Sequence, residues 1–161
     1  MTELVFMRHG HALSRQEAGV PSDQERPLSP RGEREAFESA KLLLAAGFAP
    51  DRIISSPYLR ACRTAEIAAG VFPPAARETA RAISDGPAQA LLDLAQGFYS
   101  GSERVLIVGH QPLIGAVAAY LLGDDPFDLS PAGFVRLKCD GAPGAATLLE
   151  FYAPPPPKDG R

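Results

Sequence analysis

The sequence predicts a single domain of the α/β class, in which helices cover a largely parallel β-sheet. Short apolar runs typical of buried strands alternate along the chain with segments whose apolar residues recur at helical spacing. The chain has 161 residues, of which 45% are hydrophobic and 22% charged, which is the size and composition of one globular domain. We expect this domain to span residues 1–153, followed by a frayed, Pro-rich tail at 154–161.

In the first half of the chain, two apolar runs predict buried strands, and a helix follows each of them. The strands lie at residues 4–7 and 53–54. The first helix begins at Ser29-Pro30, which has the pattern of a Ser N-cap followed by Pro at the first helical position. Its expected buried face is formed by Phe37, Ala40, Leu43 and Leu44. The helix is expected to end at Gly47. A second Ser-Pro pair, Ser56-Pro57, predicts the start of a helix that runs to about Gly70.

The second half of the chain predicts two more helices and three more strands. A helix at 87–96 precedes residues 105–108, whose continuous apolar run is the clearest buried strand in the sequence. The apolar segment 113–122 predicts a helix that ends at Gly123. The two final strands, which flank a Gly- and Pro-rich turn, are 134–139 and 147–151.

Charge and cysteine content exclude several classes of function. A formal net charge of −3 gives no global attraction to nucleic acid or to an anionic membrane, so any bound anion requires a local cluster of positive groups. Cys62 and Cys139 are far apart in the sequence and are expected to be reduced thiols. The apolar N-terminus meets Arg8 too soon to be a signal peptide, and no apolar run is long enough to cross a membrane. We therefore expect a cytoplasmic protein without nucleic-acid or membrane partners.

Polar side chains follow three of the predicted strands at the point where each strand ends. Arg8-His9-Gly10 follows the first, Arg60 lies shortly after the second, and His110 follows the strand at 105–108. Ligands of open α/β sheets bind beyond the carboxyl ends of the strands, so these side chains can share one pocket. Arginine pairs bidentately with phosphate oxygens and keeps its charge, and Gly10 allows a backbone to approach an anion closely. The predicted pocket therefore suits a phosphoryl group.

Each of these residues has a structural interpretation when it is taken alone. A His after a strand can be a satisfied core residue, and Arg60 can be a solvated helix residue; only their coincidence indicates a site. The third histidine, His11, is expected at the rim of the pocket. A zinc site is not expected, because no acidic or Cys ligand accompanies the histidines and the two arginines would repel a cation.

Four segments resemble the motifs of the histidine phosphatase superfamily, the proteins with a phosphoglycerate-mutase-like fold. They occur in the family's order and are residues 5–10, 27–32, 54–61 and 105–114. The short chain, together with Arg26-Pro27-Leu28 and the Gly-His-x-Pro-Leu-Ile motif at 109–114, resembles the SixA-type phosphohistidine phosphatases. The resemblance implies a three-layer α/β/α sandwich with a mostly parallel central sheet and no large cap insertion.

The resemblance also implies a role for each matching residue. His9 is the expected nucleophile, Arg8 and Arg60 are expected to clamp the phosphoryl oxygens, and His110 is expected to donate a hydrogen bond to the same oxygens. Arg26, which precedes Pro-Leu, is expected to add a further phosphate contact. A neutral imidazole is a competent nucleophile, and fixed cationic donors stabilise the phosphoryl transition state, so no cofactor or metal is required.

The sequence departs from one feature of the superfamily, the general acid. Members that act on alkyl phosphates carry a carboxylate after the third strand, commonly as Leu-x-Glu, and residues 78–85 contain no such motif. Glu78 and Asp85 are the only candidates there. The missing motif favours a labile substrate, namely a phosphohistidine on a protein such as a phosphotransfer domain. The alternatives are a phosphatase of a small phosphorylated metabolite with the same nucleophile, and a phosphate-binding module without turnover.

Overall fold

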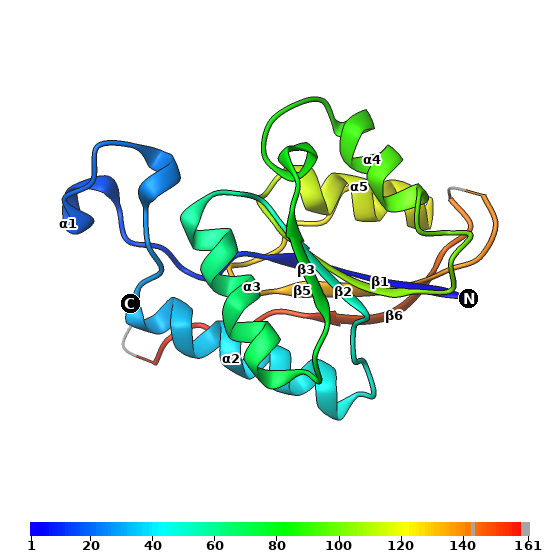
Figure 1. Ribbon diagram of the computed structural model, residues 1–161, viewed down its shortest axis with the longest axis horizontal. Coiled ribbons are helices and arrows are strands. Elements are labelled where there is room, and N and C mark those ends of the chain that lie inside the picture. Colours follow the sequence, from blue (N-terminus) through cyan, green and yellow to red (C-terminus); the bar gives the residue numbers. More distant parts are fainter. Residues whose placement is uncertain (143, 159–161) are drawn as a thin grey trace.

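The computed structural model describes residues 1–142 and 144–158, and these residues form a six-stranded mixed sheet flanked by helices (Figure 1). The strand order is β3-β2-β4-β1-β5-β6. The strands are β1 (Thr2–Arg8), β2 (Arg52–Ser55), β3 (Ala76–Thr79), β4 (Arg104–Gly109), β5 (Phe134–Cys139) and β6 (Thr147–Tyr152). Strands β1 to β4 pair in parallel, whereas β5 and β6 are antiparallel additions at one edge. The predicted α/β class with a mostly parallel sheet is confirmed.

Helices cover both faces of the sheet, which confirms the three layers (Figure 1). They are α1 (Arg15–Ala18), α2 (Pro30–Ala45), α3 (Leu59–Val71), α4 (Ala88–Gln96) and α5 (Leu113–Leu122), with short 3-10 helices η1 (Asp23–Glu25) and η2 (Arg81–Ile83). Alternate residues of β1 face opposite layers, as strand geometry requires. Leu4 and Phe6 pack in the core under α4 and α5, whereas Val5 and Met7 pack in the core under α2 and α3.

The predicted start of α2 is confirmed, but half of its predicted buried face is wrong. Ser29 Oγ accepts a hydrogen bond from Gly32 N at 3.1 Å, as expected of an N-cap, and Pro30 opens the helix. Ala40 and Leu43 are buried, but Phe37 is 45% exposed and Leu44 is 40% exposed. The buried face is centred on Gly32, Ala36, Ser39, Ala40 and Leu43. These mostly small residues face the sheet and α3, so the larger Phe37 lies outside the contact.

Two further details of the predicted elements differ from the structure. Helix α3 begins at Leu59, with Tyr58 at its N-cap, so Ser56-Pro57 is not a helix start. The sequence does not predict strand β3. All its residues are exposed at the sheet edge, so the strand has no apolar run. In contrast, α5 ends at Gly123 as predicted, and this glycine has the left-handed φ of 72° that the helix end requires.

The sheet brings the ends of three parallel strands together. β2, β4 and β1 are neighbours, and Arg8 is in register with Gly109 while Ser55 is in register with Val108. The next residues continue the pairing, because His9 N donates to Gly109 O and Ser56 N donates to Val108 O, both at 3.0 Å. The loops that follow these strands therefore start at the same end of the sheet, the carboxyl end of the parallel strands, where the sequence predicts the site.

The described part of the chain contains no membrane-spanning helix, and its Pro-rich tail has no regular secondary structure. No helix there has the length and apolar character needed to cross a membrane. The described part of the tail, up to Lys158, has no helix or strand, and Pro154, Pro155 and Pro157 line a surface hollow beside α2. Residues 159–161 lie outside the described residues, so the frayed tail stays a prediction.

Candidate active site

His9 is placed and oriented as a nucleophile by the turn that follows β1. Its side chain is buried, and its Nδ1 lies 2.7 Å from Gly10 O. A carbonyl oxygen can only accept, so Nδ1 carries the proton and Nε2 keeps its lone pair. Burial, together with the nearby His110, Arg60 and Arg8, lowers the pKa of His9 to about 3, against the raising effect of the Gly10 carbonyl. The ring is therefore neutral at physiological pH, and its unprotonated nitrogen is Nε2.

Two glycines allow this turn to pack against α2. A Cβ on Gly10 would lie 2.7 Å from Gly32 O, and a Cβ on Gly32 would lie 2.1 Å from His11 O, so neither position tolerates a side chain without movement. The Gly10 N–H donates to Thr64 Oγ1 at 3.0 Å. The structure thus gives Gly10 a packing role, and its predicted phosphate contact stays a prediction.

The predicted site residues from distant parts of the chain line one pocket. Its volume is about 320 Å³. The lining includes Arg8, His9, Arg26, Arg60 and His110, and also His11, Ala12, Gln111 and Pro131. The convergence expected from the strand ends is therefore present, and His11 lies in the lining as a further titratable group.

Arg60 contacts the nucleophile directly. Its Nε donates to His9 Nε2 at 3.3 Å, and its side chain is held inside the protein, where only 7% of the residue is exposed. Arg8 lies at the end of β1, and its Nη1 donates to Leu129 O at 2.9 Å. The Nε of Arg8 is buried and has no partner among the described residues. These guanidiniums supply the cationic donors that a phosphoryl group needs.

His110 is oriented by Ser56, a residue whose role the sequence did not reveal. His110 Nε2 lies 2.7 Å from Ser56 Oγ, and Ser56 Oγ accepts from Tyr58 N at 3.1 Å. Within the described part of the chain, His110 Nε2 is the one acceptor for the Ser56 hydroxyl hydrogen, so we infer that the imidazole proton lies on Nδ1. That Nδ1 is buried without a partner in the described part of the chain, and the His9 and His110 ring centroids are 5.1 Å apart. His110 therefore holds a free donor near the nucleophile.

The comparisons with known proteins agree with this geometry. The sequence model of the histidine phosphatase superfamily (branch 1) matches residues 4–81. A phosphohistidine phosphatase SixA homolog of Haemophilus influenzae is 32% identical over 149 residues, which cover 86% of this chain and 88% of that protein. This chain belongs to the histidine phosphatase superfamily. It is therefore a phosphatase, and its similarity to the SixA homolog extends along nearly the whole domain.

Solved structures place this phosphatase among the SixA-type members. The structure of the protein histidine phosphatase SixA complexed with tungstate is 26% identical, has a TM-score of 0.84, and covers 94% of this chain and 96% of that one. A phosphoserine phosphatase from Entamoeba histolytica, in complex with 3-phosphoglyceric acid, shares the fold at 20% identity and a TM-score of 0.69, over 96% of this chain and 98% of that one. The predicted phosphoglycerate-mutase-like fold is confirmed.

Asp23 does not line the phosphatase pocket, but it binds two arginines that do, a role that the sequence did not indicate. Its carboxylate accepts from Arg60 Nη2 at 3.0 Å and its carbonyl oxygen accepts from Arg60 Nη1 at 2.7 Å. It also accepts from Arg26 Nη1 at 3.0 Å, and the pKa of Asp23 is lowered chiefly by this bond to Arg26. Arg26 in turn donates from Nε to Leu13 O. Arg26 thus lines the pocket, but its Nε and Nη1 donate to Leu13 O and Asp23 and so stabilise the loop that contains η1.

The two general-acid candidates lie in different environments. Glu78 is on the edge strand β3, in register with Ile54, and its carboxylate pairs with Arg52 at 3.2 Å. Glu78 is thus held by Arg52 and is not among the residues that line the pocket of His9. Asp85 Oδ1 accepts from Tyr58 OH at 3.3 Å, and the Tyr58 ring centroid lies 4.9 Å from that of His110. Asp85 thus contacts Tyr58, and Tyr58 in turn packs against His110.

Among the described residues, no group of three or more His, Cys, Asp or Glu side chains could hold a metal ion. Cys62 is half-buried and Cys139 is buried, and both are free thiols. Metal independence stays a prediction of the phosphatase chemistry, and its test is given below.

Proposed function

We propose that this phosphatase hydrolyses phosphohistidine carried on a protein, through a transient phosphohistidine on His9. In the first step, Nε2 of His9 attacks phosphorus while the bond from phosphorus to the substrate imidazole breaks. The substrate imidazole leaves as a neutral ring when its other nitrogen is protonated. Arg8, Arg60 and the free Nδ1 donor of His110 would hold the phosphoryl oxygens, whose charge grows in the transition state.

In the second step, water attacks phosphorus and the bond from phosphorus to His9 Nε2 breaks. Phosphorylated His9 keeps its Nδ1 proton, which donates to Gly10 O at 2.7 Å, so His9 leaves as a neutral imidazole. The water proton passes to the inorganic phosphate. No metal or cofactor enters either step.

The observation that supports this substrate class is the absence of a carboxylate in the lining of the pocket. Its described lining holds arginines, histidines, Gln111, Ala12 and Pro131, and Asp85 contacts Tyr58 instead of the pocket. A positioned acid is typically worth about 10²–10⁴-fold in rate. An alkoxide leaving group needs such an acid, whereas the imidazole of phosphohistidine does not.

A substrate panel tests this proposal. The purified protein is offered a histidine-phosphorylated phosphotransfer domain, p-nitrophenyl phosphate and phosphoglycerate under the same conditions. We expect kcat/KM to fall in that order. If phosphoglycerate is hydrolysed as fast as p-nitrophenyl phosphate, a general acid operates in this site and a small phosphorylated metabolite becomes the better assignment.

A further inference from the structure

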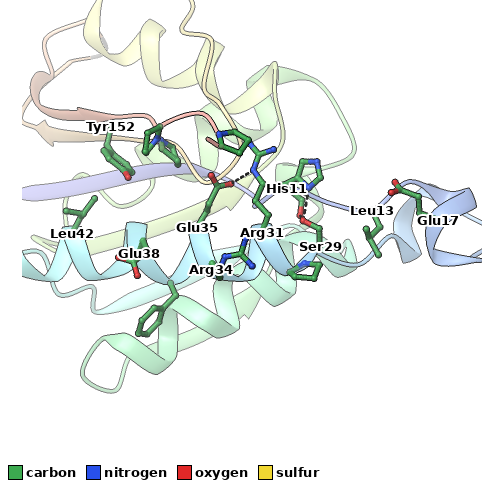
Figure 2. A pocket seen from close by; sticks show the side chains of 15 residues that line it. His11, Leu13, Glu17, Ser29, Arg31, Arg34, Glu35, Glu38, Leu42 and Tyr152 are labelled. Carbon is green, nitrogen blue, oxygen red and sulfur yellow. Dashed lines mark hydrogen bonds and ion pairs between the residues drawn. The ribbon is translucent and has the colours of Figure 1, made fainter. Parts of the chain in front are cut away.

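A second, larger hollow lies beside the catalytic pocket. It runs along α2 between the segment at 11–17 and the chain end at 152–157 and has a volume of about 1120 Å³ (Figure 2). We call this hollow the α2 groove. Its apolar walls are Leu13, Phe37, Leu42, Tyr152, Pro154 and Pro157. Phe37 and Leu42 are 45% and 41% exposed, which is unusual for large apolar side chains that face one hollow.

The α2 groove and the catalytic pocket adjoin at His11, which lines both of them. His11 Nδ1 lies 2.7 Å from Ser29 Oγ, the N-cap of α2, so the ring is held at this junction (Figure 2). A molecule lying in the groove is therefore separated from the pocket of His9 by the side chain of His11.

The dimensions and charges of the groove fit a protein surface. Small-molecule sites usually measure about 300–1,000 Å³, and the catalytic pocket already provides the space that a phosphoryl group needs. Arg31 pairs with Glu35 at 3.2 Å across the groove wall, whereas Arg34 and Glu38 form no ion pair within the described part of the chain (Figure 2). An apolar strip with charges of both signs beside it is typical of a protein-binding surface.

We propose that the α2 groove docks the protein that carries the phosphohistidine, an inference that rests on the proposed function. The docked segment lies next to the phosphorylated histidine and presents apolar side chains to Phe37 and Leu42, with charged side chains opposite Arg34 and Glu38. The phosphorylated side chain then extends past His11 to His9. The groove thus recognises the carrier protein, while the catalytic pocket recognises only the phosphoryl group.

The test compares one leaving group on two carriers. The double variant Phe37→Ser/Leu42→Ser is assayed on a histidine-phosphorylated phosphotransfer domain and on free phosphohistidine. Truncating central apolar contacts of an interface should lower kcat/KM on the protein roughly tenfold, mainly through KM. Free phosphohistidine should be hydrolysed within about twofold of the wild-type rate, because neither residue lines the catalytic pocket. Tyr120→Ser is the matched control, since Tyr120 is 58% exposed on α5, in the other helical layer.

Three results would overturn the docking proposal. One is an equal loss on both carriers, the second is no loss on either, and the third is an equal loss in Tyr120→Ser. A wild-type dimer that the double variant converts to a monomer in analytical ultracentrifugation would instead assign the groove to a second copy of this chain. The proposed function fails separately, when the wild-type protein hydrolyses p-nitrophenyl phosphate but neither form of phosphohistidine.

Discussion

Arg60 links the nucleophile of this phosphatase to a carboxylate on the neighbouring loop. Its Nε donates to His9 Nε2 at 3.3 Å, while its two Nη atoms donate to Asp23 Oδ2 and to Asp23 O. A phosphoryl group that enters the pocket must therefore share or replace the Asp23 contact. The negative charge of Asp23 competes with the phosphoryl dianion for the same guanidinium.

Removing that charge should strengthen anion binding. Asp23→Asn keeps an acceptor for Arg60 but removes the repulsion, so we expect the inhibition constant of inorganic phosphate to fall roughly three- to tenfold at low salt. The difference should shrink as ionic strength rises. A weaker inhibition by phosphate in Asp23→Asn would show that Asp23 serves mainly to position Arg60.

Ser56 should contribute to catalysis only through His110. Ser56→Ala removes the partner of His110 Nε2, so the ring loses its fixed tautomer and kcat/KM should fall about tenfold. The Tyr58 N–H also loses its acceptor, so unfolding should become easier by about 1 kcal/mol. In a His110→Ala background, Ser56→Ala should have no further effect on kcat/KM. Additive losses in the double variant would mean that Ser56 acts independently of His110.

The low pKa of His9 predicts acid-sensitive stability in phosphate-free buffer. The pKa is about 3 in the folded protein and about 6.5 in the unfolded chain, so the unfolded chain takes up the proton first as pH falls. The contribution to stability is fully present above about pH 6.5 and is lost as pH falls towards 3. From pH 7 to pH 5, His9 alone should cost on the order of 1–2 kcal/mol of unfolding free energy.

Urea denaturation at several pH values measures this contribution. His9→Asn, which lacks the titrating group, should lose less stability over the same range than the wild-type protein does. Parallel pH profiles for the two proteins would mean that His9 has a pKa close to its ordinary value in the folded state.

Chelation should leave the activity nearly unchanged. Arg8, Arg60 and His110 line the pocket where a metal clamp would otherwise lie, so dialysis against EDTA should keep kcat within about twofold. A large loss that only an added divalent cation restores would be inconsistent with this account.

The sequence was sufficient for the parts of the fold that depend on local patterns. The apolar run that became β4, the Ser29 cap and the Gly123 helix end each follow from a few neighbouring residues. Phe37 was placed in the core incorrectly, because helical spacing cannot tell which side of a partly apolar helix meets the sheet.

The site shows the same division between local patterns and tertiary contacts. His9, Arg8, Arg60 and His110 follow strand ends, and parallel strands bring such ends together. Asp23 lies in a loop whose path depends on its contacts with Arg60 and Arg26, so no local pattern marks it. Ser56 resembled a helix cap, and only the position of His110 reveals its other partner.

We propose that His9 carries the phosphoryl group during turnover, and rapid-quench labelling detects this intermediate. The enzyme is mixed with radiolabelled p-nitrophenyl phosphate, quenched within one turnover, and digested to locate the label. We expect a label on His9 that acid removes and base does not, and no label or turnover in His9→Asn. An acid-stable label on a serine, or full turnover by His9→Asn, would contradict it.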